Sequence, residues 1–279
     1  MSLSTKAVLT SLKISVWTGR KKDKTATGQV EASFSTEKQV GNYTKKLLPQ
    51  AKELDEVEAV GREARKFLEK NSLPWLSDGS RILSAMSYME TATELRNRKR
   101  NFESKVSAFL SNYETLRESS RVKLGSLFNS SDYPTVEALR GKFSFDVSFL
   151  PIPEVSDFRV EILDSEKEEF LSSMKRVETD SINYCYEKLR EVVEKAAETL
   201  RKPDARFQAS LLENIVSICG VLPKLNVYED STLEATRREV EAIVSGLSVE
   251  DLRDKKDTTE RENAARKLAE ITEKLKGLI

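Results

Sequence analysis

Two clusters of basic side chains have the residue types and the spacing to bind a ligand. The first begins at a tryptophan near the N-terminus and consists of Trp17, Arg20, Lys21, Lys22 and Lys24. Basic side chains contact phosphate groups, and an aromatic ring can stack on an unpaired base. This cluster is therefore a candidate contact for single-stranded nucleic acid. The alternative is an ordinary solvated charged surface.

The second cluster consists of Arg96, Arg98, Lys99 and Arg100 and lies in a long charged stretch of helical period. A run of charges on a long helix is usually its solvated face. The N-terminal cluster is the better candidate, because lysines in a loop beside an exposed tryptophan can reach a nucleic-acid strand.

Several kinds of chemistry find no support in the sequence. The chain has no histidine, which removes the most common general base and metal ligand. It also has no glycine-rich phosphate-binding motif. Cys185 and Cys219 lie in partly apolar, helix-like contexts and are predicted to be buried thiols, with a disulfide or a nucleophile as the alternative. We identify no catalytic residue, no metal ligand and no cofactor site, and we expect a protein that is not an enzyme.

The composition predicts a mainly α-helical fold. Charged residues make up 33% of the 279 residues and hydrophobic residues 38%, and glycine and proline are few. These values favour long amphipathic helices with solvated charged faces. The 46 basic residues balance the 46 acidic ones, so the net charge attracts neither nucleic acid nor a membrane. We recognise no signal peptide and no membrane-spanning run, and we expect a cytoplasmic protein with no membrane partner.

Hydrophobic periodicity predicts the positions of the helices. Apolar residues three or four apart predict helices over about 25–48, 51–71, 82–127, 164–201, 205–219, 231–245 and 258–278. Three of these begin with the spacing of a capping box, at Ser165 with Glu168, Ser231 with Glu234 and Thr259 with Glu262. A short strand is predicted over 12–16, where apolar and polar residues alternate.

The helix over 82–127 has a period close to a heptad. From Tyr88 to Leu124 its apolar residues recur mostly three or four apart, with Lys99 and Ser120 at the skipped positions. This spacing is typical of coiled-coil packing along a straight seam. We therefore expect an elongated bundle of long coiled-coil-like helices.

One stretch near the middle of the chain interrupts the helical pattern. Its apolar residues alternate with polar ones on both sides of a proline pair, and they are Phe143, Phe145, Val147, Phe149, Phe158, Val160 and Ile162. Alternation of period two predicts a β-hairpin or small sheet at about 142–163. An isolated hairpin is marginal in water, so its aromatic face must pack on something. Two alternatives are left open: a neighbouring subunit, or an internal sheet that includes the short strand over 12–16.

We expect two domains. Residues 1–202 would form a long-helix domain with the β insertion, and residues 203–279 would form a C-terminal helical subdomain packed on it.

The order of several short motifs resembles a family of phage and prophage helical proteins of unknown function. The matching residues are LKISVWTGRK at 12–21, LPWLSDGSR at 73–81, DYP at 132–134, FSFDVSFLPIP at 143–153, DFRV at 157–160 and RFQASLLENI at 206–215. Genes of this family often lie near genes for MoxR-type AAA+ ATPases or for DNA metabolism. The resemblance implies a protein made in the cytoplasm of a bacterial host, and it assigns no functional residue.

These observations lead to two functional hypotheses. The first is a self-assembling, ring-forming scaffold whose subunits associate through the alternating stretch and the heptad seam. The second is an oligomeric protein that binds or anneals single-stranded nucleic acid through Trp17 to Lys24. The expected partners are further copies of the chain, single-stranded DNA, or another phage or host protein.

Overall fold

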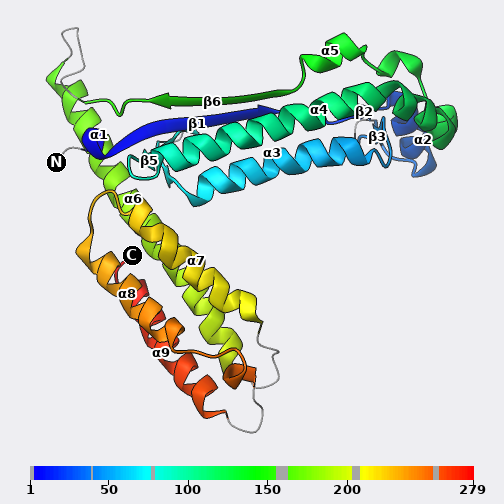
Figure 1. The fold of residues 1–279 in the computed structure, drawn as a ribbon. Helices are drawn as coiled ribbons and strands as arrows, with labels where there is room; N and C mark the ends of the chain where they lie inside the picture. Colours follow the sequence, from blue (N-terminus) through cyan, green and yellow to red (C-terminus); the bar gives the residue numbers. More distant parts are fainter. Residues whose placement is uncertain (1–2, 39, 77–78, 155–162, 203–207, 254–257) are drawn as a thin grey trace. The chain divides into compact units, whose positions relative to one another are not determined.

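The computed structural model describes residues 3–38, 40–76, 79–154, 163–202, 208–253 and 258–279. The described residues form a mainly helical protein with two small antiparallel sheets, as Figure 1 shows. The helices are α1 (Leu3–Lys6), α2 (Lys24–Ser33), α3 (Lys52–Lys70), α4 (Tyr88–Leu124), α5 (Val136–Arg140), α6 (Asp164–Arg201), α7 (Ala209–Leu225), α8 (Ser231–Ser245) and α9 (Thr259–Lys276). The strands are β1 (Ala7–Ser15), β2 (Arg20–Lys22), β3 (Thr44–Lys46), β4 (Leu73–Pro74), β5 (Arg81–Ser84) and β6 (Ser144–Leu150).

The chain divides into two compact units, and each is described by itself. The first unit consists of residues 1–11, 68–91 and 148–279, and the second of residues 12–67 and 92–147. The predicted domain boundary at residues 202–203 falls inside the first unit, where α6 packs against α7 and α9. None of the helices formed by the described residues is both long enough and apolar enough to cross a membrane.

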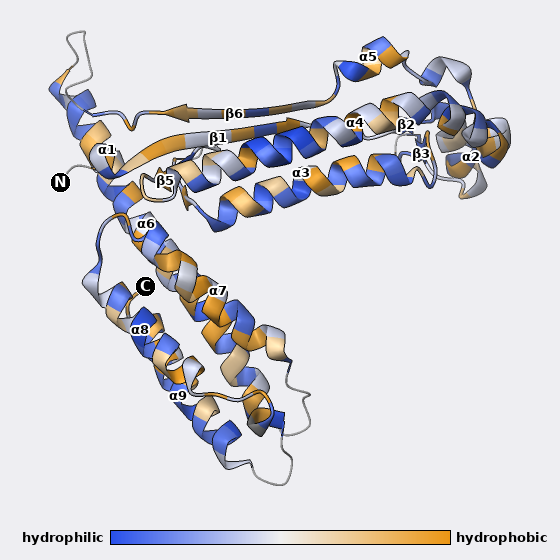
Figure 2. Cartoon of the chain, viewed as in Figure 1, coloured by the Kyte–Doolittle hydropathy of each residue, from blue (hydrophilic) through white to orange (hydrophobic). Residues whose placement is uncertain are grey.

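The first unit has a core built around α6. Apolar side chains of α6, including Cys185, Leu189 and Val193, pack with those of α7, α8 and α9. Figure 2 shows that α7 is mostly hydrophobic along its length, in agreement with the burial of five of its side chains, Leu212, Ile215, Cys219, Leu222 and Leu225. The helices predicted over 164–201, 231–245 and 258–278 are observed with nearly the predicted bounds.

The second unit has a core between α3 and α4. Phe102, Phe109 and Tyr113 of α4 are buried with Val57 and Ala64 of α3. On the surface beside this core, Lys105 pairs with Glu56 at 2.7 Å, and the Asn112 amide donates to Glu53 at 2.7 Å. Apolar residues of the predicted heptad seam are thus buried inside this chain.

The larger sheet has the strand order β4-β5-β1-β6. β1 and β5 are antiparallel, and Ala7 lies opposite Ser84. β1 contains residues 12–15 of the strand predicted over 12–16, begins five residues earlier and ends at Ser15. The smaller sheet is the hairpin-like pair of β2 and β3, in which Arg20 lies opposite Lys46.

Three of the predicted helices are partly wrong, and one of them, predicted over 205–219, is observed as α7, Ala209–Leu225. The helix predicted over 25–48 ends at Ser33, and residues 44–46 form β3 instead. Gly41 and Asn42 favour a turn there, and pairing with β2 satisfies the backbone of β3. The helix predicted from residue 82 begins at Tyr88, because Ile82 and Leu83 lie in β5 and are buried in its sheet.

The helix starts are also shifted from the predicted capping boxes. α6 begins at Asp164, where the Leu163 N–H donates to Glu166 at 2.9 Å. α8 is capped by Asp230, whose carboxylate accepts from the Leu233 N–H at 2.7 Å. Short polar side chains at neighbouring positions can cap equally well, so sequence spacing places a start only within a few residues.

The described part of the alternating stretch packs within its own chain. β6 lies beside β1, and its apolar side chains face aromatic rings of the chain: Phe143 is 5.7 Å from Phe109, Phe145 is 5.6 Å from Phe102, and Phe149 is 5.1 Å from Tyr88 between ring centroids. Val147 packs against the core of the second unit. Phe158, Val160 and Ile162 lie outside the described residues.

Candidate functional site

The predicted basic cluster of the N-terminal region lies on β2 and at the start of α2. Arg20, Lys21 and Lys22 form β2 and are all exposed. Lys24, the first residue of α2, is also exposed. β3 adds an exposed lysine opposite Arg20, Lys46. The structure therefore gathers five exposed cations on one short sheet and the helix that follows it, although they come from two segments of the chain.

A buried lysine anchors this sheet to the turns after α4. Lys45 of β3 is 4% exposed, and its Nζ lies 2.7 Å from the Asp23 carboxylate and 2.8 Å from that of Asp132. The same ammonium donates to the Leu127 carbonyl at 2.7 Å. Burial by itself lowers the pKa of Lys45, but hydrogen bonds to Asp132 and Asp23 outweigh it, and the pKa is raised above its ordinary value. Lys45 is therefore held as a charged structural link.

Asp23 has two partners that fix its charge. Its carboxylate accepts from the Ala26 N–H at 3.0 Å and so caps α2. This backbone hydrogen bond, together with Lys45, lowers the pKa of Asp23 below its ordinary value. The carboxylate is consequently ionised at neutral pH and is neutralised locally by Lys45.

An open polar cleft of about 770 Å³ lies beside this link. It is lined by residues of β2, α2 and β3, by Arg121 of α4, and by the 3₁₀ turns η1 (Gly125–Leu127) and η2 (Ser130–Asp132). Four lining cations (Lys22, Lys24, Lys45 and Arg121) face two lining carboxylates (Asp23 and Asp132), and Lys45 is the direct partner of both carboxylates. The exposed lining cations are therefore Lys22, Lys24 and Arg121, of which Arg121 also pairs with Glu118 at 3.1 Å.

The charge of the whole chain is divided unevenly between the two units. The second unit carries 22 lysines and arginines against 15 aspartates and glutamates, a net charge of +7. The first unit carries 24 against 31, a net charge of −7. The zero net charge of the sequence is thus the sum of a basic and an acidic unit, and the basic one contains the cleft.

Trp17 does not have the exposed position expected of it. It packs against the core of the second unit, with its ring centroid 6.1 Å from Tyr113 and 6.3 Å from Phe109. The exposed aromatic side chains near the cations are Phe34, at the C-terminus of α2, and Tyr43, immediately before β3. Both residues lie inside the helix predicted over 25–48, so the sequence pattern did not point to them.

The second basic cluster, Arg96 to Arg100, lies on the charged surface of α4. Arg98 pairs with Glu94 at 2.9 Å and lies over the Phe67 ring at 4.8 Å. Arg100 donates to the Asn97 side chain at 2.6 Å, and Lys99 lies 4.0 Å from Glu103. Glu94, Asn97 and Glu103 lie on the same helix as these cations, α4, and Phe67 lies on α3.

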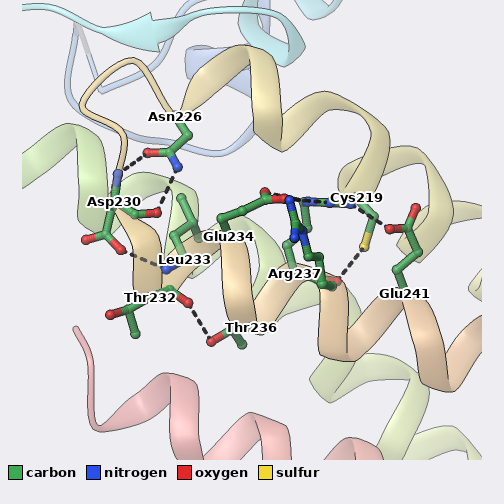
Figure 3. Close-up of polar contacts among 10 residues, drawn as sticks. Cys219, Asn226, Asp230, Thr232, Leu233, Glu234, Thr236, Arg237 and Glu241 are labelled. Atoms are coloured by element: carbon green, nitrogen blue, oxygen red, sulfur yellow. Dashed lines mark hydrogen bonds and ion pairs between the residues drawn. The ribbon is translucent and has the colours of Figure 1, made fainter.

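A polar network of the first unit lies on α8 and on its connection to α7 and is shown in Figure 3. Arg237 donates to Glu234 through Nε and Nη2 and to Glu241 through Nη1, at 2.8 to 2.9 Å. The hydrogen bond from Arg237 is the main cause that lowers the pKa of Glu234 to about 2. Asn226 and Asp230 exchange hydrogen bonds across the α7–α8 connection. Arg237, Glu234 and Glu241 all lie on α8, so their ion pairs stabilise that helix, whereas Asn226 and Asp230 fix the connection between α7 and α8.

Both thiols are buried and unpaired, as the sequence predicts. Burial raises the pKa of Cys185 to about 12 and that of Cys219 to about 11. Such thiols are poor nucleophiles at neutral pH. Within the described residues, no group of three or more cysteine, aspartate or glutamate side chains is placed to hold a metal ion.

The fold and the site together define a mainly helical two-unit protein with a basic sheet and cleft on its second unit. The chain matches the family described as "Protein of unknown function (DUF3150)" over residues 5–210 and belongs to that family. The match includes all of the second unit and ends at the start of α7. Neither a curated protein nor a solved structure matches the chain.

Proposed function

We propose that this chain is a non-enzymatic protein that binds nucleic acid through the basic sheet and cleft of its second unit. The observation that carries the proposal is the gathering of Arg20, Lys21, Lys22, Lys24 and Lys46 as exposed cations beside the cleft. The net charge of +7 on this unit supports the same partner, because phosphate backbones supply most of the affinity of nucleic acid for proteins.

The proposal makes a quantitative statement about salt. If four of the five cations contact phosphates of a single strand, the logarithm of the binding constant falls with the logarithm of salt with a slope of roughly −3. Binding of a fluorescein-labelled oligonucleotide, followed by anisotropy between 50 and 300 mM salt, measures this slope. A slope near zero, or no binding at the lowest salt, would refute the proposal.

A matched pair of variants separates the basic sheet from general charge. Lys21→Glu with Lys22→Glu should weaken binding at least 10-fold and make the salt slope shallower by roughly 1.4, because about two phosphate contacts are lost. Lys195→Glu with Lys267→Glu makes the same change in net charge on exposed positions of the first unit. Equal losses in both variants would refute the assignment to β2.

A second function, self-assembly into a scaffold, is supported by the position of β6. Among the described residues β6 forms one edge of its sheet, and such an edge can pair with a strand from another chain. The aromatic face first expected at this interface packs inside the chain, so the backbone edge of β6 would make the contact. Head-to-tail pairing of this kind closes a ring or extends a filament. In the same proposal, the long helices pack as an elongated, coiled-coil-like bundle.

The solution mass tests assembly directly. Size-exclusion chromatography with light scattering at low and high salt should give one defined multiple of the 31.6 kDa chain that survives high salt. A monomer at every salt concentration would refute assembly. Phe145→Asp is unsuited to this test, because Phe145 is buried in its own chain and the variant would report folding.

The biological setting is proposed from the resemblance to phage and prophage proteins. In that setting the chain acts in the cytoplasm of an infected bacterium, and its partners are its own copies, single-stranded DNA or another phage or host protein. Oligomerisation and nucleic-acid binding would then serve one function, because several basic units along one strand bind more tightly than a single unit.

A further inference from the structure

Four exposed apolar side chains, called here the apolar patch, lie in the segment that joins β2 to β3. Phe34 is 75% exposed and Tyr43 is 39% exposed, and Val30 and Val40 are also exposed. Large exposed side chains that gather on a soluble unit mark a binding surface more often than single ones do. Neither the cleft nor the core of the unit uses these four side chains.

Hydrogen bonds fix Tyr43 next to the cations. The Tyr43 carbonyl accepts from the Asp23 N–H at 2.9 Å, and the Tyr43 N–H donates to the Thr27 hydroxyl at 2.9 Å. Tyr43 immediately precedes β3, and the next residue, Thr44, lies opposite Lys22, the last residue of β2. Tyr43 also contacts the backbone at the start of α2. Tyr43 and Lys22 are therefore held close to each other by the local backbone.

The helix α2 carries the other half of the patch. Val30 and Phe34 are four residues apart, and the Phe34 N–H donates to the Val30 carbonyl at 3.2 Å. They therefore lie on the same side of α2, and Thr27, the hydrogen-bond partner of Tyr43, precedes Val30 by three residues on that side. One short helix and one strand end thus present both aromatic rings.

This combination favours one form of nucleic acid. In a duplex the base faces are stacked inside, so an exposed aromatic ring has no base face to contact. In a single strand every base has an accessible face, and a ring beside a phosphate contact can stack on it. A protein partner would need an apolar and an acidic surface side by side, whereas a single strand offers base faces and phosphates along its whole length.

We propose that Phe34 and Tyr43 stack on unpaired bases of a single-stranded nucleic acid whose phosphates contact β2 and the cleft. This inference rests on the proposed nucleic-acid function and specifies the form of the ligand. The base-stacking role that the sequence suggested for Trp17 is thus assigned to two exposed aromatic residues, because the Trp17 ring packs on the core.

The test compares three probes of equal length: an oligo(dT) strand, an abasic strand with the same phosphates, and a duplex. Oligo(dT) should bind the native chain at least 10-fold more tightly than the abasic strand or the duplex. Phe34→Ala and Tyr43→Ala should each weaken oligo(dT) binding by about 5-fold or more and leave abasic binding unchanged. Tyr43→Phe keeps an aromatic ring and should bind oligo(dT) as tightly as the native chain. Leu163→Ala changes an exposed apolar position of the first unit and should leave oligo(dT) binding unchanged.

The outcomes separate the two proposals. If Lys21→Glu with Lys22→Glu weakens binding but the alanine variants bind every probe like the native chain, the stacking inference is wrong and the basic sheet remains a phosphate contact. If no probe binds, both proposals are wrong. If the alanine variants change only the solution mass, the patch is a protein interface, and the stacking inference is overturned. Because Phe34 and Tyr43 are exposed, the variants should unfold at the urea concentration of the native chain, which confirms their folding.

Discussion

Replacing Lys45 with methionine should destabilise the second unit far more than the same change at Lys46. Lys45 is 4% exposed and holds two carboxylates and one carbonyl, whereas Lys46 is exposed on the same strand. Methionine has a similar length and no charge, so Asp23 and Asp132 lose their central partner. Removing one member of a buried ion pair costs about 3–5 kcal/mol. Because the two carboxylates keep 13% of their surface, we take the lower end, about 3 kcal/mol.

Urea unfolding with fluorescence detection measures this loss in the unit concerned. Trp17 belongs to the second unit and Trp75 to the first, so a Trp75→Phe background leaves Trp17 as the reporter of the second unit. With an m value of about 2 kcal/mol per M, a loss of about 3 kcal/mol lowers the midpoint by roughly 1.5 M. Lys46→Met should lower it by less than about 0.3 M, because surface substitutions change stability by about 0.5 kcal/mol or less.

A second substitution tests the cause of the effect. Adding Asp132→Asn to Lys45→Met removes a carboxylate that has lost its buried partner and whose remaining ion pair is with Lys21 at 3.9 Å, so the double variant should regain part of the lost stability. Equal midpoints for Lys45→Met and Lys46→Met would refute the conclusion that Lys45 links β3 to the turns after α4. A double variant less stable than Lys45→Met would refute the role given to the unpaired carboxylates.

Three further predictions follow from the same contacts. The pKa of Asp23 is lowered from 3.8, and the pKa of Lys45 is raised from 10.5. The stabilisation by the Lys45–Asp23 ion pair is therefore present at pH values between 3.8 and 10.5. It is lost as the pH falls through the lowered pKa of Asp23 or rises through the raised pKa of Lys45. The midpoint difference between the native chain and Lys45→Met should therefore be constant from about pH 5 to 9 and shrink outside that range. Glu234→Gln should destabilise the first unit by about 1 kcal/mol at pH 7, a value reduced because the Glu234 side chain is 30% exposed. The loss should become smaller as the pH falls towards 2, because Glu234 is then protonated in the native chain. Trp75 reports this unfolding in a Trp17→Phe background. Ellman's reagent should label Cys185 and Cys219 only when urea unfolds the chain, because both thiols are buried and have raised pKa values; rapid labelling of the native chain would contradict their burial.

The long helices could be predicted from the sequence because their apolar residues repeat over many turns. α6, α8 and α9 have nearly the predicted bounds, and α3 differs by one residue at each end. The short strands β3, β4 and β5 could not be predicted, because two to four residues give too little periodicity and tertiary pairing decides their conformation. Ile82 and Leu83 fit a helix start as well as a strand, and only the neighbouring β1 selects the strand.

The candidate site was predictable in its charges and not in its aromatic residues. Arg20, Lys21, Lys22 and Lys24 are adjacent in the chain, so their gathering needs no knowledge of the fold. Lys46 joins them only through the pairing of β2 with β3, and Lys45 is buried only because Asp23 and Asp132 meet it from two segments. Tyr43 and Phe34 lie in a segment whose predicted helix is wrong, so no periodicity argument could place them at the surface.

The division of charge between the units has a practical consequence for handling the protein. A pI near 6.6 suggests a molecule with little affinity for either type of ion-exchange resin at neutral pH. With +7 on one unit and −7 on the other, the chain should instead be retained at low salt by both cation and anion exchangers. The same opposite charges attract the basic unit of one molecule to the acidic unit of another, so precipitation on dilution into low salt should be reversed simply by adding salt.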